Sequence, residues 1–356
     1  MRIGILTQPL HANYGGILQN YALQTILKRM GHEVWTIDYL KYTWFDWLDN
    51  AWRVLAHKLL GHDVKFSQTP PERKAIERPL RRFAYQNIVL TSPRTKYAEK
   101  RIVKKYAFDA VVVGSDQVWR PMYNRYIDKM FLSFCKDTQM KRIAYAASFG
   151  TDEWEFTAEQ TKISTPLAQR FNAISVREAS GVALCRNHLK VDATHVLDPT
   201  LLLKADDYIR LCKEVPCKEP FIFAYILDQS EEKLKMIKDL SDSKGLPYLI
   251  QSADSGVSDD DSIELWLSRF RDAAYVITDS FHGTAFSINF GKDFVVFGNK
   301  RRGNSRFESL LGLFNLQDRI IEKAEICNSE INWNNVNQKL SEERQKSMNW
   351  LNEALA

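Results

Sequence analysis

Two patterns of apolar residues alternate along the chain. Short apolar runs are separated by longer stretches in which apolar residues recur at helical spacing. The short runs are typical of buried strands in a parallel sheet, and the periodic stretches are typical of the helices that connect such strands. Strands are predicted at residues 2–7, 34–37, 110–113, 142–147, 173–176, 221–226, 247–250, 274–278 and 294–297, and helices at 17–30, 231–243, 262–271 and 336–356. The pattern therefore predicts an α/β protein with two Rossmann-like domains.

The two series of strands define the expected domains. They are joined in the segment from Asp198 to Asp207. The predicted units are an N-terminal Rossmann-like domain at 1–205, a C-terminal Rossmann-like domain at 206–330 and a C-terminal helix at 331–356. A helical insertion at about 41–105 interrupts the first domain.

The insertion contains an amphipathic stretch at 44–60, in which three tryptophans and several leucines share one stripe. Cations, among them Arg53 and Lys58, lie near the other face. This arrangement suits a helix in a membrane interface, where aromatic rings and cations are both stabilised. The alternative is an ordinary helix that packs its stripe on the first domain, and the acids Asp46 and Asp49 favour that alternative.

Composition narrows the class of protein. The 356 residues suit two domains, and the 45% hydrophobic content is enough for a sizeable core. A net charge of +5 without a concentrated basic stripe argues against nucleic-acid binding and favours anionic small molecules or lipids. The five cysteines form no CxxC pair, so neither a zinc site nor a disulfide framework is expected: Cys135, Cys185, Cys212, Cys217 and Cys327. The first ten residues resemble a strand rather than a signal peptide, and no apolar run is long enough to span a membrane, so we expect a cytoplasmic protein without a metal.

Polar or cationic turns follow six of the predicted strands. In open parallel sheets, ligands bind at these carboxyl ends. Backbone N–H groups at a helix N-terminus suit anions, arginine suits carboxylates and phosphates, and histidine can move protons. The residues concerned are Asn13, Tyr14, Gly15, Gly16, Ser115, Asp116, Ser148, Arg177, Ser280, His282, Lys300, Arg301, Arg302 and Arg306. Each turn also has an ordinary structural alternative: a tight turn, a helix N-cap opened by Ser115 or Asp116, a surface ion pair or a solvated loop. Together they predict an anion-binding cleft between the domains.

A series of segments resembles the polysaccharide pyruvyl transferase family, in the order expected for it. The segments are NYGGILQNYALQ, FDAVVVGSDQVWRP, IAYAASFG, SVREASG, VLDPTLLL and TDSFHGTAFSINFGKDFVVF. The resemblance implies a fold like the two-domain GT-B glycosyltransferases, with the active site in the interdomain cleft. It also implies phosphoenolpyruvate as co-substrate, no further cofactor, and formation of a pyruvate ketal on a sugar. Arg177 and His282 match the arginine and histidine expected to contact phosphoenolpyruvate. The further basic residue expected beyond the histidine stays open among Lys300, Arg301 and Arg302.

Roles can be assigned to these residues as hypotheses. His282 is the candidate for proton transfer to the donor, and Asp116 is the candidate for orienting or deprotonating the acceptor. Donor binding is assigned to Arg177, Ser280, His282, Lys300, Arg301, Arg302 and Arg306, and acceptor binding to Asn13, Tyr14, Gly15, Gly16, Gln19, Ser115, Asp116 and Ser148. The expected acceptor is a lipid-linked saccharide of capsule or exopolysaccharide synthesis, with peripheral contact at the inner face of the membrane. The alternatives are a GT-B glycosyltransferase that uses a nucleotide sugar and a non-catalytic protein that binds anions or glycans.

Overall fold

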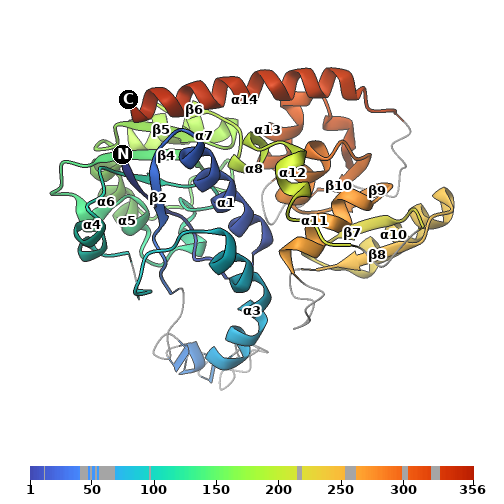
Figure 1. Cartoon of the computed structure of the whole chain (residues 1–356), viewed down its shortest axis with the longest axis horizontal. Coiled ribbons are helices and arrows are strands. Elements are labelled where there is room, and N and C mark those ends of the chain that lie inside the picture. Colours follow the sequence, from blue (N-terminus) through green and yellow to red (C-terminus); the bar gives the residue numbers. More distant parts are fainter. Residues whose placement is uncertain are drawn as a thin grey trace.

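Two parallel β-sheets, each flanked by helices, organise the chain (Figure 1). This computed structural model describes residues 1–11, 13–40, 47–48, 50–52, 54–55, 69–95, 98–214, 219–252, 262–298, 304–321 and 329–356. The first sheet has the strand order β2-β1-β3-β4-β5-β6, and the second has the order β11-β10-β9-β7-β8. The strands are β1 (Arg2–Leu6), β2 (Glu33–Thr36), β3 (Ala110–Val113), β4 (Lys141–Ala147), β5 (Ala173–Val176), β6 (Thr194–His195), β7 (Ile222–Tyr225), β8 (Tyr248–Gln251), β9 (Tyr275–Thr278), β10 (Phe294–Phe297) and β11 (Ile320–Ile321). The predicted α/β class with two Rossmann-like units is confirmed.

The helices lie between and around the strands. In the first unit they are α1 (Tyr14–Arg29), α3 (Pro70–Asn87), α4 (Lys100–Tyr106), α5 (Ile127–Met130), α6 (Ala158–Ala168) and α7 (Ala179–Leu184). The segment between the two sheets contains α8 (Pro199–Leu202) and α9 (Ala205–Ile209). The later ones are α10 (Glu231–Lys244), α11 (Ile263–Asp272), α12 (Phe281–Asn289), α13 (Ser305–Phe314) and α14 (Trp333–Leu355). Short turns of other helix types are η1 (Pro121–Tyr123), η2 (Ser133–Cys135), η3 (Cys185–Leu189) and η5 (Gln317–Arg319).

Helix α1 begins earlier than its apolar pattern predicts. Asn13 caps it, because the Asn13 Oδ1 accepts a hydrogen bond from the Gly16 N–H at 3.0 Å. Gly15 and Gly16 therefore belong to the first helical turn, and the prediction of a separate turn before residue 17 is wrong. The helix ends at Arg29, and Gly31 follows with a φ of +86°, in the left-handed region that suits glycine after a helix.

Helix α3 carries the described second half of the insertion. Its carboxyl-terminal part packs on α1 through Leu80 and Phe83, and the Phe83 ring meets Tyr21 edge-on. Of the amphipathic stretch at 44–60, residues 47–48, 50–52 and 54–55 are described and lie on helical turns. The cations Arg53 and Lys58 and the acids Asp46 and Asp49 lie outside the described residues.

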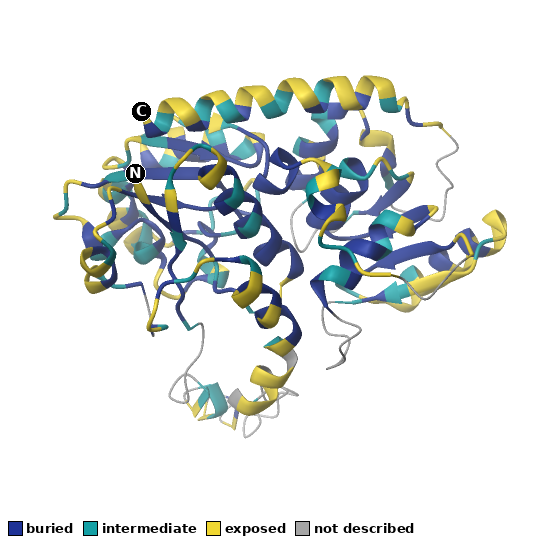
Figure 2. Cartoon of the chain, in the orientation of Figure 1, coloured by how far each residue is buried: buried dark blue, intermediate teal, exposed yellow. Residues whose placement is uncertain are grey.

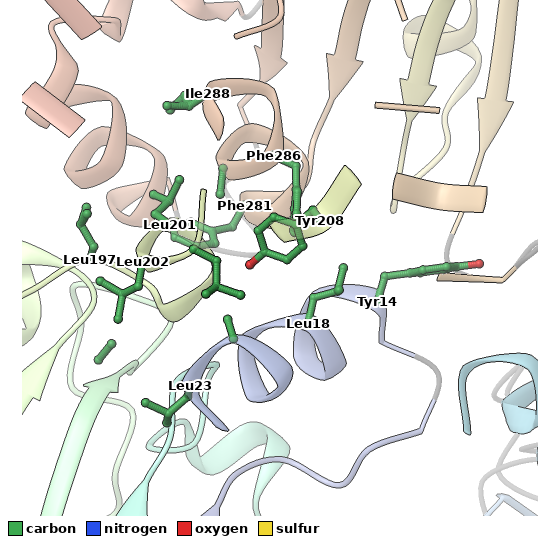
Figure 3. Packing of buried hydrophobic residues seen from close by; sticks show 14 of the residues in the cluster. Tyr14, Leu18, Leu23, Leu197, Leu201, Leu202, Tyr208, Phe281, Phe286 and Ile288 are labelled. Atoms are coloured by element: carbon green, nitrogen blue, oxygen red, sulfur yellow. The ribbon is translucent and has the colours of Figure 1, made fainter. Parts of the chain in front are cut away.

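One hydrophobic core joins the two units (Figures 2 and 3). Helix α8 packs against both α1 and α12, and Leu201 and Phe281 belong to the same buried cluster as Leu18. Tyr14, at the start of α1, stacks on Trp266 of the second unit with ring centroids 5.5 Å apart. The first turn of α1 is therefore held by side chains of the other unit.

Helix α14 crosses from the second unit back over the first (Figure 1). Near its end, the Lys141 Nζ on β4 donates to the Leu355 carbonyl at 3.0 Å, and Ser347 accepts from the Leu197 N–H at 3.0 Å. Arg344 donates to the Leu203 carbonyl and to Asn289. This helix therefore stabilises the relative position of the two sheets.

Candidate active site at the junction of the two units

A buried arginine–aspartate pair lies at the carboxyl edge of the first sheet. Arg177 follows β5, and Asp198 immediately precedes α8. The Arg177 Nη1 donates to the Asp198 Oδ2 at 2.8 Å, and both side chains are almost fully buried. Asp198 also accepts hydrogen bonds from the Ser115 hydroxyl and from Thr200. The predicted alternative of a surface ion pair for Arg177 is therefore wrong.

The surrounding charges keep both members of this pair ionised. Burial opposes ionisation of Asp198, but the neighbouring His282 and Arg177 outweigh it and hold the pKa of this carboxyl well below its usual range. Burial would likewise lower the pKa of Arg177, but Asp198 and then Asp116 outweigh it and raise that pKa. The Arg177 guanidinium also lies over the Phe281 ring, 4.2 Å from its centroid. Charge and ring together fix its orientation.

Arg177 still has unused donors. Within the described part of the chain, its Nε and Nη2 have no hydrogen-bond partner, although both atoms are buried. The nearest further carboxylate oxygen, Asp116 Oδ1, lies 3.9 Å from Nη2, which is too far for a hydrogen bond. A buried donor without a partner is costly, so the side chain is suited to receive an acceptor from a ligand.

His282 brings the second unit into the site. Ser280 caps α12 through its Oγ, which accepts from the Gly283 N–H, and this places His282 in the first turn. The His282 Nε2 lies 3.8 Å from the Asp198 Oδ2 and has no hydrogen-bond partner among the described residues. The ring is packed on Gly15: a Cβ built on that glycine would lie 1.9 Å from the His282 Nδ1. The histidine is therefore held directly against the first turn of α1.

Asp116 lies on the other side of the same turn. The Asn13 Nδ2 donates to the Asp116 Oδ2 at 3.1 Å, and the Gln117 N–H donates to its Oδ1 at 2.9 Å. The backbone φ of Asp116 is +72°, a conformation that non-glycine residues adopt at some energetic cost and often at functional sites. The segment after β3 is a series of turns and not a helix, so the prediction that Ser115 or Asp116 opens a helix as an N-cap is wrong.

Arg306 is a second buried cation near Arg177. It lies in the first turn of α13 and not in a loop. Burial, and then the charge of Arg177, lowers the pKa of Arg306 to about 10, while Glu178 and Asp116 act in the opposite direction. Two buried cations that repel each other favour the binding of an anion between or beside them. Lys300, Arg301 and Arg302 lie outside the described residues.

The family of the protein follows from sequence comparison. The chain matches the family described as polysaccharide pyruvyl transferase over residues 13–301, which is most of its length. The chain belongs to this family. The match includes every described side chain of the site except Arg306. Comparison with curated proteins gave no significant match.

Three solved structures show a distant likeness to this chain. UDP-GlcNAc 2-epimerase from Methanocaldococcus jannaschii is similar with a TM-score of 0.47 and 11% identity, over 98% of this chain and 93% of that one. The S. aureus MnaA–UDP structure has a TM-score of 0.48 and 10% identity, over 98% and 90%. An alpha-glucosyltransferase in complex with UDP-glucose and DNA has a TM-score of 0.43 and 10% identity, over 99% and 94%.

Three residues assigned to the acceptor lie beside the candidate centre, with side chains that are hydrogen-bonded inside the protein. The Tyr14 hydroxyl accepts from the Gln251 Nε2 at 2.9 Å, so this side chain points into the joint between the units. The Gln19 Nε2 donates to the Thr7 hydroxyl and to the Gly16 carbonyl inside the first unit. Ser148 is buried, and its backbone N–H donates to the Asp116 carbonyl. The structure thus brings Asn13, Gly15, Gly16, Ser115, Asp116, Arg177 and His282 together and places these three residues around them.

Asp198 is the residue that the strand-end argument missed. It follows the two-residue strand β6, which is too short to give an apolar pattern. The available signal was the segment VLDPTLLL, in which an aspartate precedes a proline at the start of a short helix. Asp198 caps that helix, since its Oδ1 accepts from the Thr200 N–H, while its Oδ2 holds Arg177.

Metal-dependent and thiol-dependent chemistry find little support in the described residues. They contain no group of three or more His, Cys, Asp or Glu side chains placed to hold a metal ion. Burial raises the pKa of the Cys135 and Cys185 thiols to about 12, so neither is a reactive thiolate. Cys217 and Cys327 lie outside the described residues. No described helix has the length and apolar character needed to cross a membrane.

Proposed function

We propose that the protein transfers the enolpyruvyl unit of phosphoenolpyruvate to a saccharide, forms a pyruvate ketal and releases phosphate. The proposal rests on family membership and on one observation above all. Arg177 is buried, its charge is fixed by Asp198, and its Nε and Nη2 remain without a partner among the described residues. Planar guanidinium donors in this state suit the carboxylate or phosphate of the donor.

The donor carries two anionic groups, and the site offers more than one cationic element. Arg177 and Arg306 are buried within each other's field, and the His282 Nε2 lies beside the same carboxylate as Arg177. Binding a phosphate and a carboxylate here would relieve the repulsion between the two arginines. Lys300, Arg301 and Arg302 precede α13 in the sequence, and this cationic segment is proposed to add a further cation. Ser280, as the cap of α12, is proposed to support His282.

The reaction needs one proton on the donor methylene carbon. In the proposed sequence, His282 gives this proton to the methylene, which becomes a methyl group, and positive charge develops at the neighbouring carbon. A sugar hydroxyl attacks that carbon and loses its proton. A second hydroxyl of the same sugar then displaces phosphate, taking its place at the carbon, and its proton leaves with the phosphate. Asp198, ionised and 3.8 Å from the Nε2, faces the nitrogen that would exchange the proton.

Asp116 is proposed to orient the sugar hydroxyl or to take its proton. Each of its oxygens already accepts one hydrogen bond, from Asn13 or from the Gln117 N–H. A carboxylate has about four acceptor positions, so capacity for a hydroxyl remains. Ser115, Gly15 and Gly16 are proposed to contribute to the same corner, where a Cβ added to Gly16 would lie 3.2 Å from the Asp116 Oδ2. The acceptor is proposed to be a lipid-linked saccharide of capsule or exopolysaccharide synthesis, met at the inner face of the membrane.

Calorimetry with phosphoenolpyruvate tests the proposal without knowledge of the acceptor. Binding is expected with chelator present, because no metal is assigned to the donor. In Arg177→Lys and His282→Gln, the affinity should fall about 10- to 100-fold, which is the contribution of one charge-assisted hydrogen bond. UDP and UDP-sugars should give no heat.

Matched controls separate binding from folding. Arg81 forms a buried, two-pronged pair with Asp38 outside the site, so Arg81→Lys should lower stability and leave donor affinity unchanged. His188 stacks on Trp154 away from the site, and His188→Gln should bind as the wild type does. If the wild-type protein binds no phosphoenolpyruvate, or binds UDP-sugars instead, the proposed donor is wrong.

A further inference from the structure

Three large apolar side chains are exposed on successive helical turns of the insertion. Leu48 is 45% exposed, Trp52 is 70% exposed and Leu55 is 43% exposed. Spacings of four and three residues place them on one side of a helix. Val54, on a different side, is buried. In the part of the chain that the structure describes, these three side chains form an uncovered apolar stripe, so it is not the core-facing surface that an ordinary amphipathic helix would have.

Helix α3 presents a cationic stripe. Lys74, Arg78 and Arg82 are exposed at spacings of four residues, so they share one side of the helix. The opposite side is buried through Leu80 and Phe83. Among the described residues, none of the three cations is held in an ion pair. The amino-terminal half of α3 and the described helical turns at 47–48, 50–52 and 54–55 both lie at the lower edge of the first unit in Figure 1, beyond α1.

We propose that the apolar stripe (Leu48, Trp52, Leu55) and the cationic stripe (Lys74, Arg78, Arg82) together bind the surface of an anionic lipid bilayer. Tryptophan and leucine side chains enter the boundary between headgroups and acyl chains, and lysine and arginine meet the anionic headgroups. The cationic stripe and the anionic headgroups carry complementary charges, which favours a bilayer as the partner of this surface. A second copy of the chain, docked through a two-fold axis, would bring the same cationic stripe close to itself and repel.

This surface does not include Arg177 or its neighbours, so the membrane proposal and the proposed function can each be refuted without the other. Flotation with phosphatidylcholine vesicles, with or without phosphatidylglycerol, measures the binding of the whole chain to a bilayer directly. The wild type is expected to float with the anionic vesicles only, and high salt should weaken binding because it screens the headgroup charge. Phosphoenolpyruvate binding should be the same with and without vesicles.

Two variants test the contribution of each stripe to membrane binding. Lys74→Gln/Arg78→Gln/Arg82→Gln should lower partitioning onto anionic vesicles by about 100-fold, since each cation near such a surface contributes about fivefold. Trp52→Ser/Leu55→Ser should lower it by about tenfold or more, since buried apolar surface is lost. All five side chains are exposed, so both variants should unfold at the wild-type temperature.

A matched charge control completes the test. Lys104→Gln/Lys235→Gln/Lys238→Gln removes the same charge from exposed positions elsewhere and should float as the wild type does. The proposal is overturned if the wild type stays unbound on anionic vesicles, or if the control loses as much binding as the α3 variant. It is also overturned if the wild type is a dimer that Trp52→Ser/Leu55→Ser converts to a monomer, because the stripe would then be an interface between copies.

Discussion

Adding one methyl group at Gly15 should displace the imidazole of His282. A Cβ at this position would lie 1.9 Å from the His282 Nδ1 and 2.1 Å from its Cγ, where ordinary contacts begin at 3.4 Å. The ring would have to retreat by about 1.5 Å, the difference between these distances. The first turn of α1 cannot readily move instead, because Asn13 is bonded to Asp116 and Tyr14 is stacked on the second unit.

Two effects on stability oppose each other in Gly15→Ala. Alanine in a helix is favoured over glycine by about 1 kcal/mol, and less in a first turn. Overpacking costs about 1–3 kcal/mol, so the free energy of unfolding should fall by about 1–2 kcal/mol. Gly312 in α13 is the matched control, because the nearest atom to its added Cβ is 3.7 Å away. Gly312→Ala should therefore leave stability unchanged or raise it.

The ligand readout is the affinity for phosphoenolpyruvate by calorimetry. Displacing the imidazole should remove one charge-assisted hydrogen bond, and the affinity of Gly15→Ala should fall about 10- to 100-fold. Gly312→Ala should bind as the wild type does. If Gly15→Ala has both wild-type stability and wild-type affinity, the glycine does not position His282, and the reasoning from the close contact would be refuted.

Three further outcomes follow from the buried contacts. Asp198→Asn should lower the free energy of unfolding by about 3 kcal/mol in urea titrations, because the buried charge of Arg177 loses its partner. The control Asp207→Asn removes a carboxylate from a partly exposed pair, so it should lower the free energy of unfolding by about 1 kcal/mol or less. The folded-state pKa of Asp198 lies below its usual range, so its stabilisation is present above about pH 4 and is lost as the pH falls further; Asp198→Asn should thus lose less stability on acidification than the wild type. Tyr14→Phe should cost about 1–2 kcal/mol, since the buried Nε2 of Gln251 loses its acceptor, and equal stability would contradict the proposed joint.

The pattern of apolar residues was sufficient to predict the strands that bury both faces. Runs such as AVVV and FVVF are buried at every position, so hydrophobicity alone locates them. The edge strands β6 and β11 have two residues each, and no periodicity exists at that length. The first turn of α1 was misplaced because glycine is a poor helix former, and its presence there reflects the packing of His282, a contact between residues far apart in sequence.

At the site, too, local sequence predicts some features, while others depend on contacts between residues far apart in the sequence. The proximity of Arg177, His282 and Asp116 could be predicted, because each follows a strand and parallel strands bring such positions to one edge. Local sequence could not show that Tyr14 faces the second unit, since that depends on how the two sheets are joined. Nor could it show that Asp198 serves both as the cap of α8 and as the partner of Arg177.

The position of Asp198 connects the joint between the units with the chemistry of the site. It begins the segment that leads from the first sheet to the second, and α8, which it caps, packs on both α1 and α12. One carboxylate oxygen therefore fixes the helix between the units, while the other holds Arg177 and faces His282. Because the arginine comes from the first unit and the histidine from the second, any change in the angle between the sheets would alter the distance between them. The shared core, the Tyr14 joint and helix α14 all oppose such a change. The proposed site therefore requires a rigid connection, because its proposed donor-binding residues are divided between the two units.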